Sequence, residues 1–153
     1  MERREALRTG MMTVLVGLAV LGVFLVSLTG CWPVINDVET GKTPEYPDLV
    51  PRTYAAKPEL VFDAALHAIH RLPRWSLVAH RPESGEIRAE ATSRLFRFVD
   101  DVTIRVRDEE GKTVVSVRSA SRVGKGDFGQ NARNIRAFFE ALDAQLQRPD
   151  EHR

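Results

Sequence analysis

The sequence lacks several features that would point to a particular chemistry. Its 153 residues include a single cysteine, Cys31, so no disulfide can form within the chain. Basic and acidic residues nearly balance, with a formal net charge of +1 at pH 7. Nucleic-acid-binding proteins usually carry a strong basic excess or a basic stripe. We therefore expect no nucleic-acid partner.

Motifs for cofactors, metals and catalysis are also missing. The GKT at Gly41–Thr43 lacks the upstream glycine of a phosphate-binding loop. The histidines His67, His70 and His80 come without the carboxylate spacing that completes a zinc site. No serine lies in a GxSxG turn. We expect neither a cofactor nor a metal.

What the chain does have is a distinctive amino terminus. Arg3, Arg4 and Arg8 precede an almost wholly apolar run over Met11–Leu28. A basic start and then an apolar run are typical of a secretory signal, although this run is also long enough for a borderline transmembrane helix. The residues directly after the run distinguish the two.

The apolar run ends in Leu28-Thr29-Gly30-Cys31, which resembles the lipobox of bacterial lipoproteins. We interpret residues 1–30 as a signal peptide and Cys31 as the lipidated residue that attaches the protein to a membrane. A plain membrane anchor with a free cysteine is the alternative. We expect the protein in the bacterial cell envelope, facing the periplasm. Trp32, rather than aspartate, after the cysteine favours the outer membrane in a Gram-negative cell.

Proline marks the segment after the cysteine. Because proline fixes φ and lacks a backbone donor, we expect an extended tether over 31–51. The globular domain is then expected over 52–148, with a polar tail over 149–153. The prolines of the tether are Pro33, Pro44, Pro47 and Pro51.

Hydrophobic periodicity predicts an α+β domain. Short connections between the predicted strands favour antiparallel pairing. We predict a two-layer sandwich, with an antiparallel sheet of four to five strands and two helices on one face. The expected elements are a possible strand over 53–56, a helix over 57–72, strands over 75–80, 87–93, 96–107 and 113–122, and a helix over 128–147.

Two polar stretches hold the candidate functional residues. Asp100 and Asp101 could act as paired acid–base groups, but adjacent strand residues point to opposite faces, so a structural role at the strand start is the alternative. In the second stretch, RSASRVGKGDFGQN, alternation places Ser119 and Ser121 on the apolar face of their strand. The arginines of this strand, Arg118 and Arg122, fall on the opposite face.

The second stretch continues into the last helix. Asp127 is a good N-cap, with Gln130 in the capping-box position and Asn131 as an alternative cap. Glycines beside Lys125 and Arg122 would suit an anion pocket at the helix start. The Asp127 carboxylate, however, would occupy the place that an anion needs.

Both stretches resemble a known family. FRFVDDVTIRV and VRSASRVGKGDFGQNARNIR, with INDVETG nearer the amino terminus, are similar to the bacterial and plastid family called domain of unknown function 1499. The resemblance runs roughly over Val34–Leu146. It implies a boundary and no mechanism, because the family has no established activity. The residues that carry it are Asp100, Asp101, Arg118, Ser119, Ala120, Ser121, Arg122, Gly124, Asp127, Gly129 and Asn131.

Three functions remain open from the sequence. The first is a non-catalytic module that binds an anionic small molecule, a glycan or a protein, with charge from Arg118, Arg122 and Lys125 and orientation from the two serines and Asn131. The second is a structural adaptor whose polar stretch only holds the fold together.

The third function is an envelope hydrolase. It would use Asp100 or Asp101 together with Asp127, assisted by Arg118 and Arg122. This chemistry requires the carboxylates and arginines to meet in one cleft, and fails if Asp127 caps the helix and the other aspartates diverge.

Overall fold

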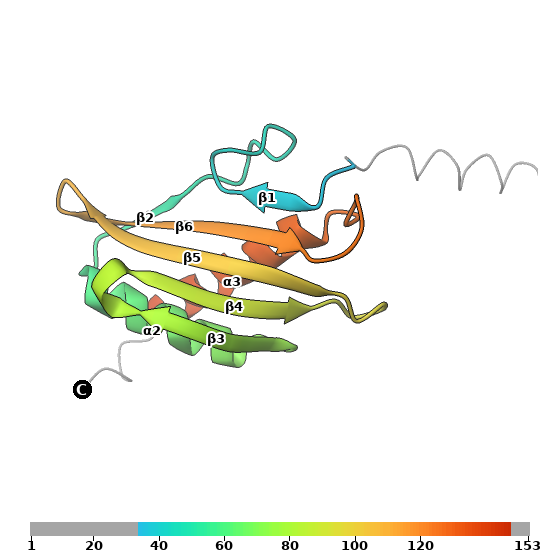
Figure 1. Cartoon of the computed structure of the whole chain (residues 1–153). Helices are drawn as coiled ribbons and strands as arrows, with labels where there is room; N and C mark the ends of the chain where they lie inside the picture. Colours follow the sequence, from blue (N-terminus) through green and yellow to red (C-terminus); the bar gives the residue numbers. More distant parts are fainter. Residues whose placement is uncertain (1–33, 148–153) are drawn as a thin grey trace, which may run out of the picture. The chain divides into compact units, whose positions relative to one another are not determined.

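The computed structural model describes residues 34–147, which form one sheet and two helices (Figure 1). The predicted signal peptide, Cys31 and the polar tail lie outside this range. The elements in chain order are β1 (Asp37–Glu39), β2 (Arg52–Tyr54), α2 (Pro58–Arg71), β3 (Trp75–Arg81), a 3-10 turn (Pro82–Ser84), β4 (Glu86–Thr92), β5 (Val99–Glu109), β6 (Lys112–Ser121) and α3 (Gln130–Leu146).

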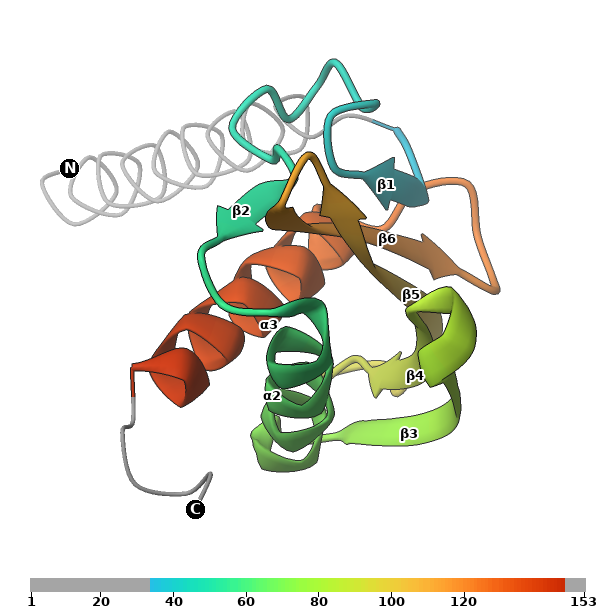
Figure 2. The ribbon, with the colours of Figure 1, turned by 90° about the vertical axis from the view of Figure 1, so that its left-hand side faces the viewer.

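The sheet is antiparallel throughout, with the strand order β1-β6-β5-β4-β3. Since β5 takes one edge of β6, both short strands pair with the other edge: Val38 of β1 lies opposite Ser119, and Thr53 of β2 lies opposite Val114. Figure 2 shows α2 and α3 on one face of the sheet. The predicted α+β sandwich is confirmed, with β1 as a strand that the sequence pattern did not indicate.

The helices begin and end where local sequence dictates. Pro58 occupies the first turn of α2, where its missing N–H costs no hydrogen bond, and α2 ends at Arg71, shortly before Pro73. Neither α2 nor α3, the two helices of the described range, is long and apolar enough to cross a membrane. Their buried apolar stripes consist of Val61, Phe62, Ala64, Ala65, Ala68 and Ile69 in α2, and Ala132, Ile135, Phe138, Phe139 and Leu142 in α3.

The core lies between the helices and the inner face of the sheet. Alternate residues of the three long strands are buried there, as the period of two predicted. The inward-facing apolar residues are Ile87, Ala89 and Ala91 of β4, Val102, Ile104 and Val106 of β5, and Val115 and Val117 of β6.

The segment predicted as a tether is part of the domain from Asp37 onward, so that prediction was wrong for most of 31–51. The side chains of Val38 and Leu49 are buried in the core. Thr40 exchanges hydrogen bonds with Val117, at 3.0 Å through its amide and 3.1 Å through its hydroxyl. The edge of β6 supplies backbone hydrogen-bond partners to this segment. These partners lie far away in the sequence, so the prolines of the segment do not indicate them.

One turn is shaped by a close backbone approach. Gly85 follows the 3-10 turn with φ of +64°, in the left-handed region that favours glycine. A Cβ atom at this position would lie 2.0 Å from the carbonyl oxygen of Val106. The turn between β3 and β4 therefore packs against β5 only because residue 85 has no side chain.

Candidate functional site

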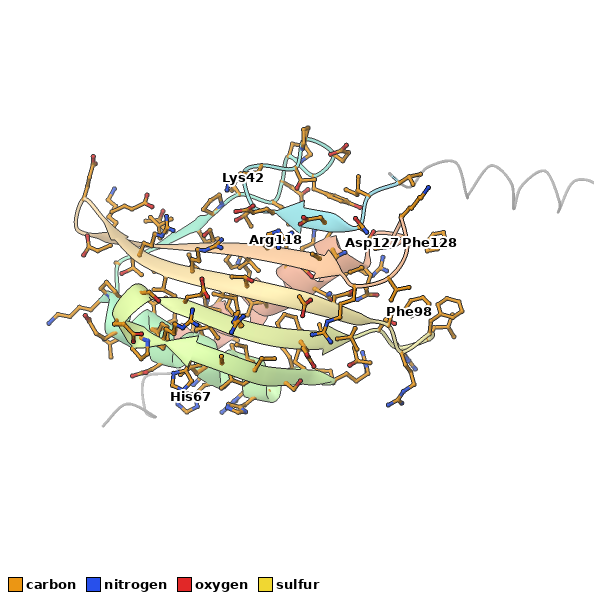
Figure 3. The ribbon with its side chains drawn as sticks, in the orientation of Figure 1. Lys42, His67, Phe98, Arg118, Asp127 and Phe128 are labelled. Carbon is orange, nitrogen blue, oxygen red and sulfur yellow. The ribbon has the colours of Figure 1, made fainter. Side chains whose placement is uncertain are left out.

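The predicted site residues gather at one end of the sheet, where β5 begins and β6 ends. The loop over 122–129 connects β6 to α3 at this end, and the loop over 93–98 connects β4 to β5 beside it. Figure 3 shows Asp127, Phe128 and Phe98 together there. We refer to these two loops as the loop end of the domain.

A buried polar network ties β6 to α3. The Ser119 hydroxyl donates a hydrogen bond to Asn131 Oδ1 at 2.6 Å. Asn131 Nδ2 in turn donates to the Ser121 hydroxyl at 2.9 Å and to the carbonyl of Asn36 at 3.0 Å. Ser119 and Asn131 have no solvent exposure, so these bonds replace water that the groups lost on folding. Both serines point inward, as predicted from the strand period.

Asp100 extends the network to the start of β5. Its two carboxylate oxygens accept hydrogen bonds from the Ser121 hydroxyl at 2.7 Å and from Asn134 Nδ2 at 2.9 Å. Burial raises the pKa of Asp100, and the charges of Asp127 and Asp101 act in the same direction, whereas the two hydrogen bonds oppose the shift. Asn134 also reaches the Ser119 hydroxyl at 3.2 Å and was missed by the sequence analysis.

Asp101 lies on the opposite face of β5 from Asp100, as strand geometry predicted. It accepts hydrogen bonds from Arg122 at 2.6 and 3.1 Å, and these bonds lower the pKa of the Asp101 carboxyl. The same guanidinium donates to Glu90 of β4. The Arg122 charge is therefore already matched by two carboxylates.

Two further strand arginines, Arg118 and Arg105, are paired with carboxylates in the same way. Arg118 donates to Asp37 of β1, and Arg105 lies within 4 Å of both Glu39 and Glu86. This face of the sheet thus carries ion pairs between its strands, with Arg118 near the centre of the view in Figure 3. An incoming anion would compete with these carboxylates, and exposed pairs of this kind stabilise a fold only slightly.

Asp127 accepts hydrogen bonds from backbone amides at the start of α3. Its carboxylate accepts hydrogen bonds from the amides of Gly129 at 2.8 Å and Asn131 at 2.7 Å. The expected capping box was wrong, because Gln130 bonds Asn134 at 2.8 Å instead of reaching back along the chain. Gly129, with φ of +74°, is the residue that immediately precedes the helix.

The structure brings only part of the proposed hydrolase set together: Asp100 and Asp127 line the same cavity, whereas the other groups lie elsewhere. Asp101 and the two arginines lie on the ion-paired face, whereas Asp100 lies on the buried face and Asp127 is engaged by the helix start. Lys125 is exposed in the loop over 122–129. Among residues 34–147, no group of three or more metal-ligating side chains occurs.

A cavity of about 510 Å³, which was not predicted from the sequence, opens at the loop end. Its polar lining includes Asp100, Ser121, Asp127, Gln130, Arg94 and Arg133, while its other walls are largely apolar. The signal in the sequence was the number of large apolar residues in polar loops. These residues, with their exposed fractions, are Leu95 (79%), Phe96 (64%), Phe98 (49%), Val123 (64%) and Phe128 (66%).

The fold and the site define an α+β domain in which the most distinctive polar residues hold strands and helix together. The chain belongs to the family described as Protein of unknown function (DUF1499), whose model matches residues 27–142. The resemblance found in the sequence is thereby confirmed. None of the curated proteins matches this chain.

Two solved structures are similar to the domain at low identity. The crystal structure of TTHA0849 from Thermus thermophilus is 13% identical, covers 72% of this chain and 96% of its own, and has a TM-score of 0.39. The crystal structure of Ara h 8.0201 is 11% identical, covers 73% of this chain and 98% of its own, and has a TM-score of 0.33. Scores at this level carry no information on the function of this chain.

Proposed function

We propose that this protein is a lipid-anchored protein of the bacterial cell envelope whose domain acts as a non-catalytic binding module. Cys31 carries the lipid, and the domain faces the periplasm. The sequence Leu28-Thr29-Gly30-Cys31 after a basic start and an apolar run supports the anchor. Arg118, Arg122 and Asp101 are paired on the face away from the cavity that Asp100 and Asp127 line, which supports a role in binding rather than hydrolysis.

The observation that carries the binding role is the cavity at the loop end. Its volume of about 510 Å³ suits a small molecule, and its walls combine aromatic rings with a few polar groups. The Asp100–Ser121 pair offers hydrogen-bonding atoms, and Arg94 and Arg133 offer positive charge. We expect an amphipathic ligand, with its apolar part against Phe98.

The residues that line the proposed binding site differ from those expected from the sequence. Arg118 and Arg122 are engaged by carboxylates on the other face, and Ser119 and Asn131 are buried in the network. Only part of the polar stretch therefore faces the cavity. Ser121, Asp127 and Val123 of this stretch line it.

The anchor is tested by replacing the lipidated residue. Cys31→Ser removes the acceptor thiol, so we expect the chain to lose its acyl modification and to remain uncleaved. Mass spectrometry of the purified chain and labelling of growing cells with a fatty acid measure both effects. A variant that is processed and membrane-held like the wild type would refute the lipid anchor.

The binding site is tested with a matched pair of exposed apolar residues. Phe98→Asp places a charge in the cavity wall, whereas Val78→Asp places the same charge at an exposed position of β3 away from it. We expect native mass spectrometry to detect a small bound molecule in the wild type and in Val78→Asp, but not in Phe98→Asp. A molecule retained equally by both variants would contradict the assignment of the cavity.

A further inference from the structure

We propose that the loop end docks onto the surface of an anionic phospholipid bilayer. The first observation is the concentration of exposed apolar side chains on the two loops. Leu95, Phe96 and Phe98 come from one loop, and Val123 and Phe128 from the other. The rings of Phe96 and Phe98 stack with their centres 5.6 Å apart at the tip. Exposed apolar clusters of this kind mark interaction surfaces.

The second observation is the charge between these apolar residues. Arg94 and Arg97 alternate with the apolar side chains of the first loop, and Lys125 lies near the centre of the second. All three are exposed and form no ion pair within residues 34–147, in contrast to the strand arginines. Apolar residues that enter the acyl boundary beside basic residues that meet lipid phosphates are typical of interfacial membrane binding.

The third observation is the position at which the described chain begins. Ser121 donates its amide to the carbonyl of Asn36 at 2.8 Å, and Asp127 donates its amide to that of Ile35 at 3.1 Å. The side chain of Asn36 donates to the carbonyl of Gly124 at 2.6 Å. These bonds hold the residues next to Val34 against the loop over 122–129, at the loop end itself.

The anchor is close to Val34 in the sequence. Only Trp32 and Pro33 separate Cys31 from Val34. A lipid on Cys31 therefore keeps the loop end within reach of the bilayer at all times. In this respect the docking rests on the proposed function, and the apolar and basic residues of the loops supply the contact.

The turn at the opposite end of the sheet is acidic, whereas the loop end is basic. Strand β5 runs away from the loop end and finishes in Asp108 and Glu109, and Glu110 follows in the turn to β6 (Figure 1). An acidic turn is repelled by anionic lipid, whereas the basic loop end is attracted to it. This polarity favours one orientation of the domain on the membrane. It also favours lipid over an uncharged protein partner, which would not require basic residues around the apolar contact.

The docking is tested with a fluorescent thiol label at either end of the domain. Leu95→Cys places the label at the loop end, and Glu110→Cys places it at the acidic turn. In the lipidated chain the Cys31 thiol is consumed, so each variant has one reactive thiol. The chains are reconstituted into vesicles of phosphatidylethanolamine and phosphatidylglycerol that carry a lipid-bound quencher. We expect a blue shift and strong quenching at residue 95, and neither at residue 110.

Two variants separate the docking contacts from the anchor. The double variant Phe96→Ala, Phe128→Ala should lower the ratio of docked to undocked domain, measured at residue 95, by about tenfold or more. The control is the double variant Leu60→Ala, Val78→Ala. It removes exposed apolar residues elsewhere and should leave this ratio unchanged. Vesicles of phosphatidylcholine alone should give weaker quenching at residue 95, because they offer the basic residues no anionic surface.

Three results would overturn the docking. Equal quenching at both positions means that the domain has no preferred end, and absence of quenching at both means that it stays clear of the lipid. A shift at residue 95 that follows protein concentration without vesicles means that a second copy occupies the surface. Label uptake by the wild-type chain refutes the lipid on Cys31 separately, and the docking is then measured in the Cys31→Ser background.

Discussion

Ser119 and Asn131 form a fully buried hydrogen bond of 2.6 Å between the end of β6 and the first turn of α3. This bond explains why the most distinctive stretch of the sequence is polar although it lies in the core. The strand supplies two hydroxyls, the helix supplies an amide side chain, and the Asp127 carboxylate closes the turn between them. A buried network of this kind stabilises one arrangement of strand and helix when every member is satisfied.

The first prediction concerns Asn131. Asn131→Ala leaves the buried Ser119 hydroxyl without its acceptor and removes one of the two donors to the carbonyl of Asn36, so we expect the free energy of unfolding to fall by about 3 kcal/mol. Urea unfolding followed by circular dichroism measures the loss. Glu140→Ala, at an exposed position of α3, should change it by less than about 0.5 kcal/mol. Equal effects of the two substitutions would show that the network contributes nothing.

The second prediction uses two adjacent aspartates with opposite pKa shifts. The pKa of Asp100 is raised above its ordinary value of about 3.9, so the folded chain keeps this proton longer than the unfolded chain. Its contribution to stability is present below that value and is lost as pH rises through the folded pKa. The pKa of Asp101 is lowered, so its contribution is present above about 3.9 and is lost as pH falls through the folded pKa.

Asparagine variants separate these two contributions. Relative to Asp100→Asn, the wild type should lose stability as pH rises from about 3 through the raised pKa. Relative to Asp101→Asn, it should gain stability as pH rises over the acidic range. Urea midpoints across this range measure both differences. Slopes of the same sign would contradict the assignment of Asp100 to the buried face and Asp101 to the ion-paired face.

The third prediction concerns the start of α3. Asp127→Ala removes the acceptor of the Gly129 and Asn131 amides, and we expect a loss of about 1 kcal/mol in the free energy of unfolding. Asp127→Asn retains one side-chain oxygen and should lose less. Hydrogen exchange of the amides in the first turn of α3 should accelerate in the alanine variant. Unchanged exchange in that turn would argue against the capping role.

The fourth prediction compares two glycines in turns. Gly85→Ala would bring a methyl group to 2.0 Å from the Val106 carbonyl, so we expect a loss of at least about 3 kcal/mol. Gly111→Ala meets nothing within 4 Å, although its φ of +78° is also in the left-handed region, and should cost about 1 kcal/mol. Thermal unfolding of the two variants measures the difference. Similar midpoints would mean that the β3–β4 turn can move away from β5.

Periodicity alone predicted the α+β class and the faces of single strands. The inward direction of Ser119 and Ser121 and the divergence of Asp100 from Asp101 follow from the alternation of side chains along a strand. These properties depend only on neighbours in the sequence. The elements predicted from them agree with the structure to within a few residues at most ends.

Contacts between distant segments were not predictable in this way. Prolines after Cys31 suggested a tether, yet Val38 pairs with β6 because that strand has an unoccupied edge 81 residues later in the chain. Gln130 fitted a capping box by spacing, yet it bonds Asn134 because Asp127 and Gly129 set the actual start of the helix.

The sequence by itself determined the fold class, the family and the faces of the strands, because each depends on local order along the chain. Only the tertiary structure decided what the polar residues do. In the folded domain, Arg118 and Arg122 form ion pairs with carboxylates of neighbouring strands, and Asn131 is buried and hydrogen-bonded to Ser119. Two separate loops line one cavity. Partners for buried polar groups and the walls of a cavity come from segments far apart in sequence, and only folding places them within hydrogen-bonding distance.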